Sequence, residues 1–299
     1  MSSGSSPFER LVTVPVTGST QDDLRDALTG PEASSWPHLS ALRALRQTAG
    51  RGRSGHSWIT PDDGALLVSV VLRPLVPAER LAWLPLLAGL AVRDALAPFL
   101  EELEWRLATK WPNDVVAEPK DPSTVDAVPG WAGSRKIAGV LSELITQDPS
   151  ETPAARRPAS EEVPASRDQA PVVVLGIGVN IAQEADDLPV AWAGSLRTLG
   201  AFDADADAAE AILEVIGHQL VRRLEQWEAV DGDVDAGEGV LGGELRAALT
   251  TLGQRVSVQA PGGELDGLAV DVTPALVLRD QGGDIEVRAG DVTLVRVEE

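Results

Sequence analysis

Along most of the chain, apolar residues fall either into short continuous runs or into stripes with helical spacing. The short runs are rich in Val, Leu and Ile, as is typical of buried strands. They span residues 66–72, 103–110, 137–144 and 172–181. The helical stripes cover residues 79–100 and 208–227, and Pro85 and Pro98 are expected to bound or kink the first. Interleaved strands and helices predict an α/β (α+β) domain, with a central sheet flanked by helices.

A further helix is expected to begin shortly after Gly18. Thr20 and Asp23 have the spacing of a capping box, and acidic residues occupy the turn that would follow.

The pattern changes near residue 252. Apolar positions then alternate in short stretches, separated by Gly, Asp and Pro turns, and a short helix is expected just before them at 244–250. This alternation predicts a small all-β barrel over residues 252–299, following a main domain of residues 14–251.

Three segments lack either pattern. Residues 1–13 begin with a Ser- and Gly-rich stretch and are expected to be disordered or loosely attached. Residues 118–135 and 147–170 interrupt the main domain and are interpreted as surface insertions. The second is dense in Pro, Ala, Ser and acidic residues, which predicts disorder.

The composition narrows the classes of protein to consider. At 43% hydrophobic and 24% charged residues, the chain is typical of globular proteins. We find no apolar run near the roughly 20 residues that cross a bilayer and no signal-peptide core, so we expect a cytoplasmic protein with no membrane partner. The chain has no Cys and only scattered His, which excludes thiolate chemistry and argues against a zinc enzyme.

Charge is distributed unevenly. A net charge of −21 opposes binding to nucleic acid phosphates, so we expect no DNA partner. Residues 41–60 nevertheless contain Arg43, Arg46, Arg51 and Arg53 and no carboxylate, which allows a local anion site.

The segment Gln47 to Trp58 has the composition of such a site. Its glycines free backbone N–H groups to wrap an anion, and Arg51 and Arg53 add donors for carboxylate or phosphate. We expect residues 51–58 to be mobile without ligand and to order on binding, because nothing negative holds the two arginines. The alternative is a solvated Gly-rich hairpin.

Three further motifs combine polar groups with predicted strand ends. Lys110-Trp111-Pro112-Asn113-Asp114 suits a nucleotide and magnesium edge, or else is a polar turn. Lys136 opens a strand containing Ala138 and Gly139, where a ligand could approach closely; the alternative is an edge lysine that prevents aggregation. Gly176-Ile177-Gly178-Val179-Asn180 is a weak signal on its own.

Taken in order, the series GSTQ, QTAGRGRSGxSW, KWPND, RKIAGVLSE and GIGVNI closely resembles the biotin–protein ligase family. The resemblance covers roughly residues 14–197, and the C-terminal pattern matches the SH3-like barrel that such ligases carry. It implies a class II synthetase-like catalytic domain with a mixed sheet. The implied activity is formation of biotinyl-5′-AMP from biotin and ATP, followed by transfer to a lysine of a biotin carboxyl carrier domain.

The resemblance also implies residue roles. Biotin would be bound by Ser19, Thr20, Gln21, Gln47, Arg51, Gly52, Arg53, Lys136 and Gly139. ATP would be bound by Arg51, Arg53, Trp58, Lys110, Asn113 and Asn180. Arg53, Lys136 and Asp114 would be catalytic, with Asp114 also the candidate Mg²⁺ ligand. Residues 187–196 resemble a second mobile loop, with Trp192 as an apolar lid.

Some members of the family carry an N-terminal DNA-binding domain, but here the first motif begins at residue 18, and we expect none. A monomer or weak homodimer is expected. The rival functions are a lipoate or octanoate ligase or transferase of the same fold, and a non-catalytic biotin-binding module. The intact GRGRSG and KWPND motifs favour biotin over lipoate, and the retention of both Arg53 and Lys136 favours an enzyme.

Overall fold

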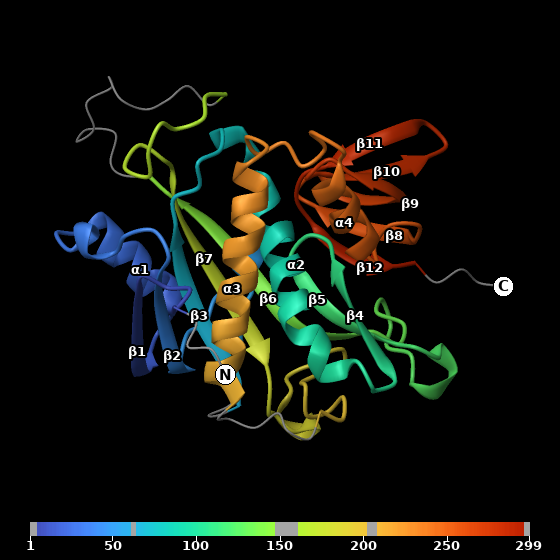
Figure 1. The fold of residues 1–299 in the computed structure, drawn as a ribbon. Helices are drawn as coiled ribbons and strands as arrows, with labels where there is room; N and C mark the ends of the chain where they lie inside the picture. Colours follow the sequence, from blue (N-terminus) through green and yellow to red (C-terminus); the bar gives the residue numbers. More distant parts are fainter. Residues whose placement is uncertain (1–4, 61–63, 147–160, 202–207, 296–299) are drawn as a thin grey trace.

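A mixed seven-stranded sheet forms the centre of the protein in a computed structural model, which describes residues 5–60, 64–146, 161–201 and 208–295 (Figure 1). The strands are β1 (Arg10–Thr17), β2 (Ser40–Gln47), β3 (Ala65–Leu72), β4 (Trp105–Lys110), β5 (Asp114–Pro119), β6 (Arg135–Ile145) and β7 (Val172–Asn180). Their order is β1-β2-β3-β7-β6-β5-β4. Only β1 and β2 run parallel; the other neighbours are antiparallel.

Helices cover both faces of this sheet. They are α1 (Thr20–Thr29), α2 (Leu84–Leu96) and α3 (Ala208–Glu228). A fourth helix, α4 (Val240–Ala248), contacts α2 and lies beside the C-terminal strands in Figure 1. Short 3₁₀ turns occur at Ala33–Ser35, Arg53–Gly55, Ala78–Trp83, Ala97–Leu100, Pro122–Thr124 and Ala185–Asp187. In Figure 1, α2 and α3 lie side by side across one face, where they join the same core as Leu66 and Val68 of β3. On the opposite face, Leu24 of α1 packs with Val71 of β3.

The predicted helix at 79–100 is a buried core helix. Pro85 starts α2 at its first turn, and Pro98 lies in the 3₁₀ turn that ends it. Contrary to our expectation, the stretch Ala78–Leu100 is long and apolar enough to cross a membrane by length and composition, with a mean hydropathy of 1.4. Two thirds of that window is buried inside the protein, as in the core helices of soluble proteins.

The N-terminus of α1 differs by one residue from the prediction. Ser19, not Thr20, is the N-cap, and its side chain accepts a hydrogen bond from the Asp22 backbone N–H. Thr20 and Gln21 therefore lie inside the first turn, and both are buried.

A second, five-stranded antiparallel sheet follows α4, consistent with an SH3-like domain. Its strands are β8 (Arg255–Ala260), β9 (Gly263–Val272), β10 (Leu276–Asp280), β11 (Gly283–Val287) and β12 (Asp291–Leu294), in the order β11-β10-β9-β8-β12. Val256 and Leu276 belong to the same hydrophobic core as α2. The Trp111 indole N–H also donates to the Pro274 carbonyl across 3.1 Å. The two sheets thus share one interior.

Two segments are more ordered than predicted. Residues 10–13 belong to β1, and Phe8 is only 7% exposed, so the expected loose attachment of residues 1–13 is wrong for this part. Within the predicted insertion at 118–135, Trp131 is buried at 9% exposure. A surface insertion is therefore the wrong description for Trp131.

Much of the second predicted insertion, residues 147–160, lies outside the described residues. In the described part, the Arg167 guanidinium donates to Glu228 of α3 and to the Arg73 carbonyl. Disorder is therefore the wrong prediction for Arg167.

His38 makes the stability of the fold dependent on pH. Burial, and next the Arg167 guanidinium, lower the pKa of His38 from 6.5 to about 4, and its Nδ1 accepts a hydrogen bond from the Arg73 N–H. Only the neutral ring fits this site, so the unfolded chain takes up a proton first as the pH falls. The contribution of His38 is complete above pH 6.5 and is lost between pH 6.5 and about 4.

We expect the free energy of unfolding to fall by about 1–2 kcal/mol more between pH 7.5 and 5 in the wild type than in His38→Gln. Chemical denaturation at both pH values measures the difference. His218→Gln, on the exposed face of α3, is the control and should retain the wild-type slope. Identical slopes for wild type and His38→Gln would contradict this assignment.

Candidate functional site

A cavity of about 620 Å³ opens on the face of the sheet that carries the first turn of α1. Every residue that the sequence analysis assigned to a site lines it: Ser19, Thr20, Gln21, Gln47, Arg51, Gly52, Arg53, Trp58, Lys110, Asn113, Asp114, Lys136, Gly139 and Asn180. The structure therefore brings together five motifs that are far apart in the chain.

One end of the cavity is a buried polar cluster. The Thr20 N–H and hydroxyl both donate to Gln47 Oε1, at 2.7 and 3.0 Å. The Thr20 hydroxyl also lies 2.8 Å from that of Ser69, which donates to Gln21 Oε1 across 3.2 Å. The Gln21 amide N–H donates to the Val174 carbonyl. Such a cluster can exchange hydrogen bonds with a ligand that carries both N–H and C=O groups.

Ser69 is a member of this cluster that the sequence analysis missed. It lies in the middle of β3, whose other residues are all apolar, and it is 1% exposed. A lone hydroxyl within an apolar strand needs a polar partner, because burying it without one is costly. A single serine within an apolar strand was therefore the feature of the sequence that could have identified Ser69 as a site residue.

The floor of the cavity consists of glycines beneath the Trp58 ring. A Cβ atom at Gly178 would lie 2.6 Å from this ring, and one at Gly139 would lie 3.0 Å from it. A Cβ atom at Gly176 would meet Gln21 Oε1 at 2.7 Å. The Trp58 indole N–H is buried and has no hydrogen-bond partner. The glycines of the weak GxGxN motif are therefore required by close contact, a role the sequence analysis did not assign to Gly176 and Gly178.

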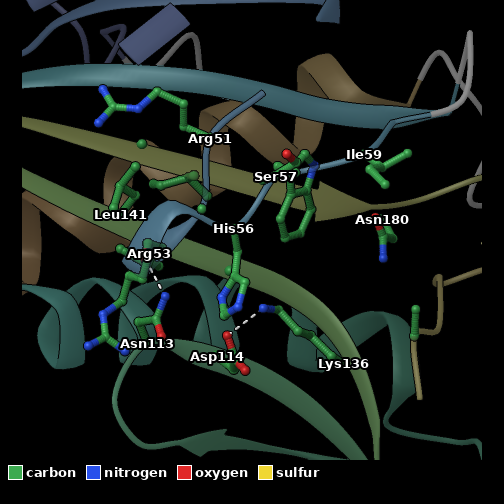
Figure 2. A pocket seen from close by; sticks show the side chains of 18 of the residues that line it. Arg51, Arg53, His56, Ser57, Ile59, Asn113, Asp114, Lys136, Leu141 and Asn180 are labelled. Carbon is green, nitrogen blue, oxygen red and sulfur yellow. Dashed lines mark hydrogen bonds and ion pairs between the residues drawn. The ribbon is translucent and has the colours of Figure 1, made fainter. Parts of the chain in front are cut away.

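The other end of the cavity is charged. Lys136 Nζ lies 2.7 Å from Asp114 Oδ1, and Figure 2 shows the two side chains pointing toward one another. Both come from the first residues of adjacent strands, since Asp114 begins β5 and Lys136 is the second residue of β6. The Lys136 ammonium also lies 5.5 Å from the centre of the Trp58 ring. These contacts do not support the alternative of an edge lysine that only protects the sheet.

The C-terminal domain completes this end of the cavity. The ammonium of Lys110 donates to the Val292 carbonyl across 2.6 Å, and Arg53 donates to the Gly290 carbonyl across 3.4 Å. Asp291 lies 4.0 Å from Arg53 and also lines the cavity. Sequence reasoning missed Asp291, because its place in the site depends on how the two sheets meet.

Burial weakens the protonation of two of these cations. It lowers the pKa of Lys110 and that of Arg53, and in both cases the Asp114 and Asp291 carboxylates act in the opposite direction. The nearby Lys136 lowers the pKa of Lys110 further. A bound anion would relieve this repulsion.

Arg51 is positioned differently from Arg53. Its guanidinium lies 2.7 Å from Asp22 and 3.1 Å from Glu143, and in Figure 2 it lies far from Lys136. Our reasoning that nothing negative holds the arginines of the loop is therefore wrong. Asp22 and Glu143 escaped it because they are distant in sequence.

The two asparagines of the site hold its walls. Asn113 Nδ2 donates to the Val140 carbonyl at 2.6 Å. Asn180 Nδ2 donates to Gly194, and its Oδ1 accepts from Gln183. Through Gly194, Asn180 fixes the segment of residues 187–196, which the sequence analysis expected beside the site.

The acidic residues that line the cavity, Asp114 and Asp291, decide what metal could bind. Among the described residues, no group of three or more His, Cys, Asp or Glu side chains gathers as a metal site. Mg²⁺ is usually held by one or two carboxylates together with substrate phosphates. The cavity therefore fits Mg²⁺ that arrives bound to a phosphate ligand.

Known proteins resemble this chain over nearly its whole length. Residues 14–152 match the Biotin/lipoate A/B protein ligase family. The chain is 31% identical to the biotin–[acetyl-CoA-carboxylase] ligase of Mycobacterium tuberculosis over 296 residues, 97% of this chain and 91% of that protein. The ligase of the same name from Paracoccus denitrificans is 26% identical, over 92% of this chain and 97% of that protein.

A solved structure shares the fold. It is a biotin protein ligase from Aquifex aeolicus in complex with biotin and ATP, with a TM-score of 0.66 and 23% identity over 97% of this chain and 100% of that one.

The contact between Gly178 and Trp58 can be tested by a double-mutant cycle. We expect Gly178→Ala to cost about 1–3 kcal/mol of unfolding free energy, because the new methyl group overlaps the ring. In a Trp58→Ala background the same change should be nearly silent. Chemical denaturation of all four proteins measures the coupling. Gly18→Ala, where a Cβ meets nothing within 4 Å, is the control. Equal costs in both backgrounds would show that the two residues do not touch.

Proposed function

The chain belongs to the biotin–protein ligase family, and we propose that this cavity, lined by both domains, performs the two half-reactions of that family. The two relatives that match over most of their length are named biotin–[acetyl-CoA-carboxylase] ligases, and we propose the same activity for this chain. It activates biotin with ATP to biotinyl-5′-AMP and pyrophosphate, and then transfers biotin to a lysine of a biotin carboxyl carrier domain.

The observation that carries the proposal is the division of the cavity into a polar end, a glycine floor and a cationic end. The amide and hydroxyl groups of Thr20, Gln21 and Ser69 suit the ureido group of biotin, which has both N–H donors and a carbonyl acceptor. The body of biotin would lie in the cavity between this polar end and the cations, so that its carboxylate would reach Lys136 and Arg53.

The first half-reaction joins two anions. A carboxylate oxygen of biotin attacks the α-phosphorus of ATP, the bond to the β-phosphate breaks, and pyrophosphate leaves. Lys136 and Arg53 would offset the repulsion between the reactants and stabilise the charge that gathers on the α-phosphate. Mg²⁺, held by Asp114 together with the phosphates, would supply further positive charge. No side chain forms a covalent intermediate.

Asp114 has a positioning role in this scheme. Its carboxylate holds the Lys136 ammonium at 2.7 Å before substrate arrives, which keeps the lysine in one place. In the second half-reaction, the neutral amine of the carrier lysine attacks the acyl carbon, AMP leaves, and a proton is lost from nitrogen. Asp114 is our candidate to orient this amine or accept that proton.

The nucleotide contacts are proposals of the same kind. Trp58 would pack against adenine, and its unpartnered indole N–H is free to donate to the ligand. Lys110, Asn113 and Asn180 line the same space but already bind protein carbonyls, so they would shape the nucleotide site, and Lys110 would also contribute charge.

The polar end of the cavity also distinguishes biotin from lipoate and octanoate, the substrates of the rival function. The dithiolane ring of lipoate and the tail of octanoate carry no N–H or carbonyl group to match Gln21 and Thr20. A site built to hydrogen-bond its substrate rejects analogues that leave its polar groups unpaired. This favours biotin over lipoate or octanoate, and Lys136 and Arg53 favour an enzyme over a binding module.

We also propose that the protein acts in the cytoplasm as a monomer or weak homodimer that binds neither DNA nor membranes. Its net charge of −21 supports the absence of a DNA partner.

The direct test of function is labelling of a carrier domain. With biotin, ATP and Mg²⁺ we expect an avidin-detectable label on one carrier lysine, and with lipoate in place of biotin we expect no lipoylation. A protein that lipoylates the carrier and leaves biotin unused would establish the rival function instead.

At the polar end, we expect Ser69→Ala to raise KM for biotin roughly 2- to 12-fold, as for one lost hydrogen bond. kcat and KM for ATP should stay near wild type, since the reacting carboxylate lies at the other end of the cavity. Steady-state kinetics with each substrate varied separates these parameters. A lowered kcat with unchanged KM for biotin would place Ser69 elsewhere in the mechanism.

At the cationic end, we expect Lys136→Arg to fold normally but to form biotinyl-AMP roughly 100- to 1000-fold more slowly. The planar guanidinium cannot occupy the point of the ammonium, and a misplaced preorganised charge contact typically costs about 2.7–4 kcal/mol. Single-turnover adenylation measures the effect, with thermal unfolding as the control for folding. Wild-type adenylation by a stable variant would remove Lys136 from the mechanism.

A further inference from the structure

Trp131 is the only cavity-lining residue contributed by the segment of residues 118–135. The local sequence around it, rich in Gly, Ser and Ala, is typical of a solvated loop. The ring is nevertheless 9% exposed and clusters with Ala108 of β4 and Val116 of β5. A loop residue thus forms a wall of the site.

Trp131 stacks on Trp192, which comes from the segment of residues 187–196. The ring centroids are 4.5 Å apart and the planes differ by 4°. The Lys110 ammonium lies 4.3 Å from the centre of the Trp131 ring, which is within the range of a cation–π contact. Trp131 therefore contacts both Lys110 of the site and Trp192 of the segment of residues 187–196.

The position of Trp192 is coupled to that of Lys136. The backbone N–H of Lys136 donates to the Trp192 carbonyl, and the N–H of Gly194 donates to the Lys136 carbonyl, both at 2.8 Å. The Trp192 ring lies 5.9 Å from the Lys136 ammonium. A displacement of Trp192 would break the hydrogen bonds that hold this segment beside Lys136.

Trp131 itself is anchored on both sides. Its N–H donates to the Val128 carbonyl at 2.9 Å, and the Leu294 N–H of β12 donates to the Gly130 carbonyl at 3.0 Å. The ring therefore has a fixed support on the C-terminal domain, and its stacking on Trp192 adds to the two backbone hydrogen bonds that hold the Trp192 segment beside Lys136.

We propose that Trp131 is a positioning residue that, by stacking on Trp192, holds residues 189–196 against Lys136 before any substrate binds. The inference rests on the proposed function, because what this segment then covers is biotinyl-5′-AMP. A covered mixed anhydride is retained and protected from water until the carrier lysine arrives. Trp131 touches no reacting atom and acts through Trp192.

Two measurements test this role. Amide hydrogen exchange over residues 189–196 in the ligand-free protein measures how firmly this segment is held. The release rate of preformed biotinyl-AMP measures the consequence for the bound intermediate. Trp131→Ala is expected to accelerate both by roughly 2- to 10-fold, the size of one lost aromatic stack. Trp131→Phe keeps an aromatic ring at this position, so its rates of exchange and of release should both be close to those of the wild type.

Trp105→Ala is the matched control, because Trp105 lies on β4, is partly buried against the core and does not line the cavity. It should change neither measurement. If Trp131→Ala does not fold, Trp192→Ala removes the same stack from the other side and should give the same accelerations.

The inference fails if exchange and release stay at wild-type values in the folded stack variant, or if Trp105→Ala accelerates them equally. Failure of the proposed function looks different, since the wild type would then form no biotinyl-AMP. The exchange measurement does not depend on enzyme activity, so it tests by itself whether Trp131 holds residues 189–196.

Discussion

The ion pair between Lys136 and Asp114 is the interaction on which the charged end of the site depends. The cavity contains the cations Lys136, Lys110 and Arg53, and burying like charges together is unfavourable without a partner. Asp114 lies 2.7 Å from Lys136 and opposes the lowering of pKa that burial causes at Lys110 and Arg53. Asp291 and Asp114 thus both oppose the effect of burial on Arg53 and Lys110, and Asp114 also holds Lys136 in place.

The strands place this ion pair opposite the polar end of the cavity. Asp114 begins β5 and pairs with Gly139 of β6, while Ser69 and Gly176 pair across β3 and β7. Gly139 and Gly178, which lie between these two ends, allow the Trp58 ring to pack closely against the sheet. The cavity thus has hydrogen-bonding groups at one end and cations at the other. This arrangement suits biotin, which has a ureido group at one end and a carboxylate at the other, and the triphosphate of ATP.

The motifs in the sequence indicated which residues line the cavity, while the binding and catalytic roles of these residues stay predictions. Every assigned residue lines the cavity, because the motifs themselves carry the signal. Strands β3, β4, β6 and β7 and helices α2 and α3 were expected from apolar runs and stripes. Strand β2 was missed because its arginines interrupt the apolar pattern, and β1 because it follows a Ser- and Gly-rich start.

The contributions of Trp131 and Asp291 could not be predicted, because each depends on a tertiary contact. Trp131 becomes a wall only through Trp192, and Asp291 enters the site only because β12 meets the first domain.

The C-terminal sheet thus closes the site rather than adding a separate module, since Val292 binds Lys110 and Gly290 binds Arg53. The central claim is that this cavity activates biotin before any carrier is present. Exchange of labelled pyrophosphate into ATP, measured without a carrier, tests it most directly. The account predicts exchange that requires biotin and is not supported by lipoate. Exchange without biotin, or no exchange in a protein that binds both substrates, would contradict it.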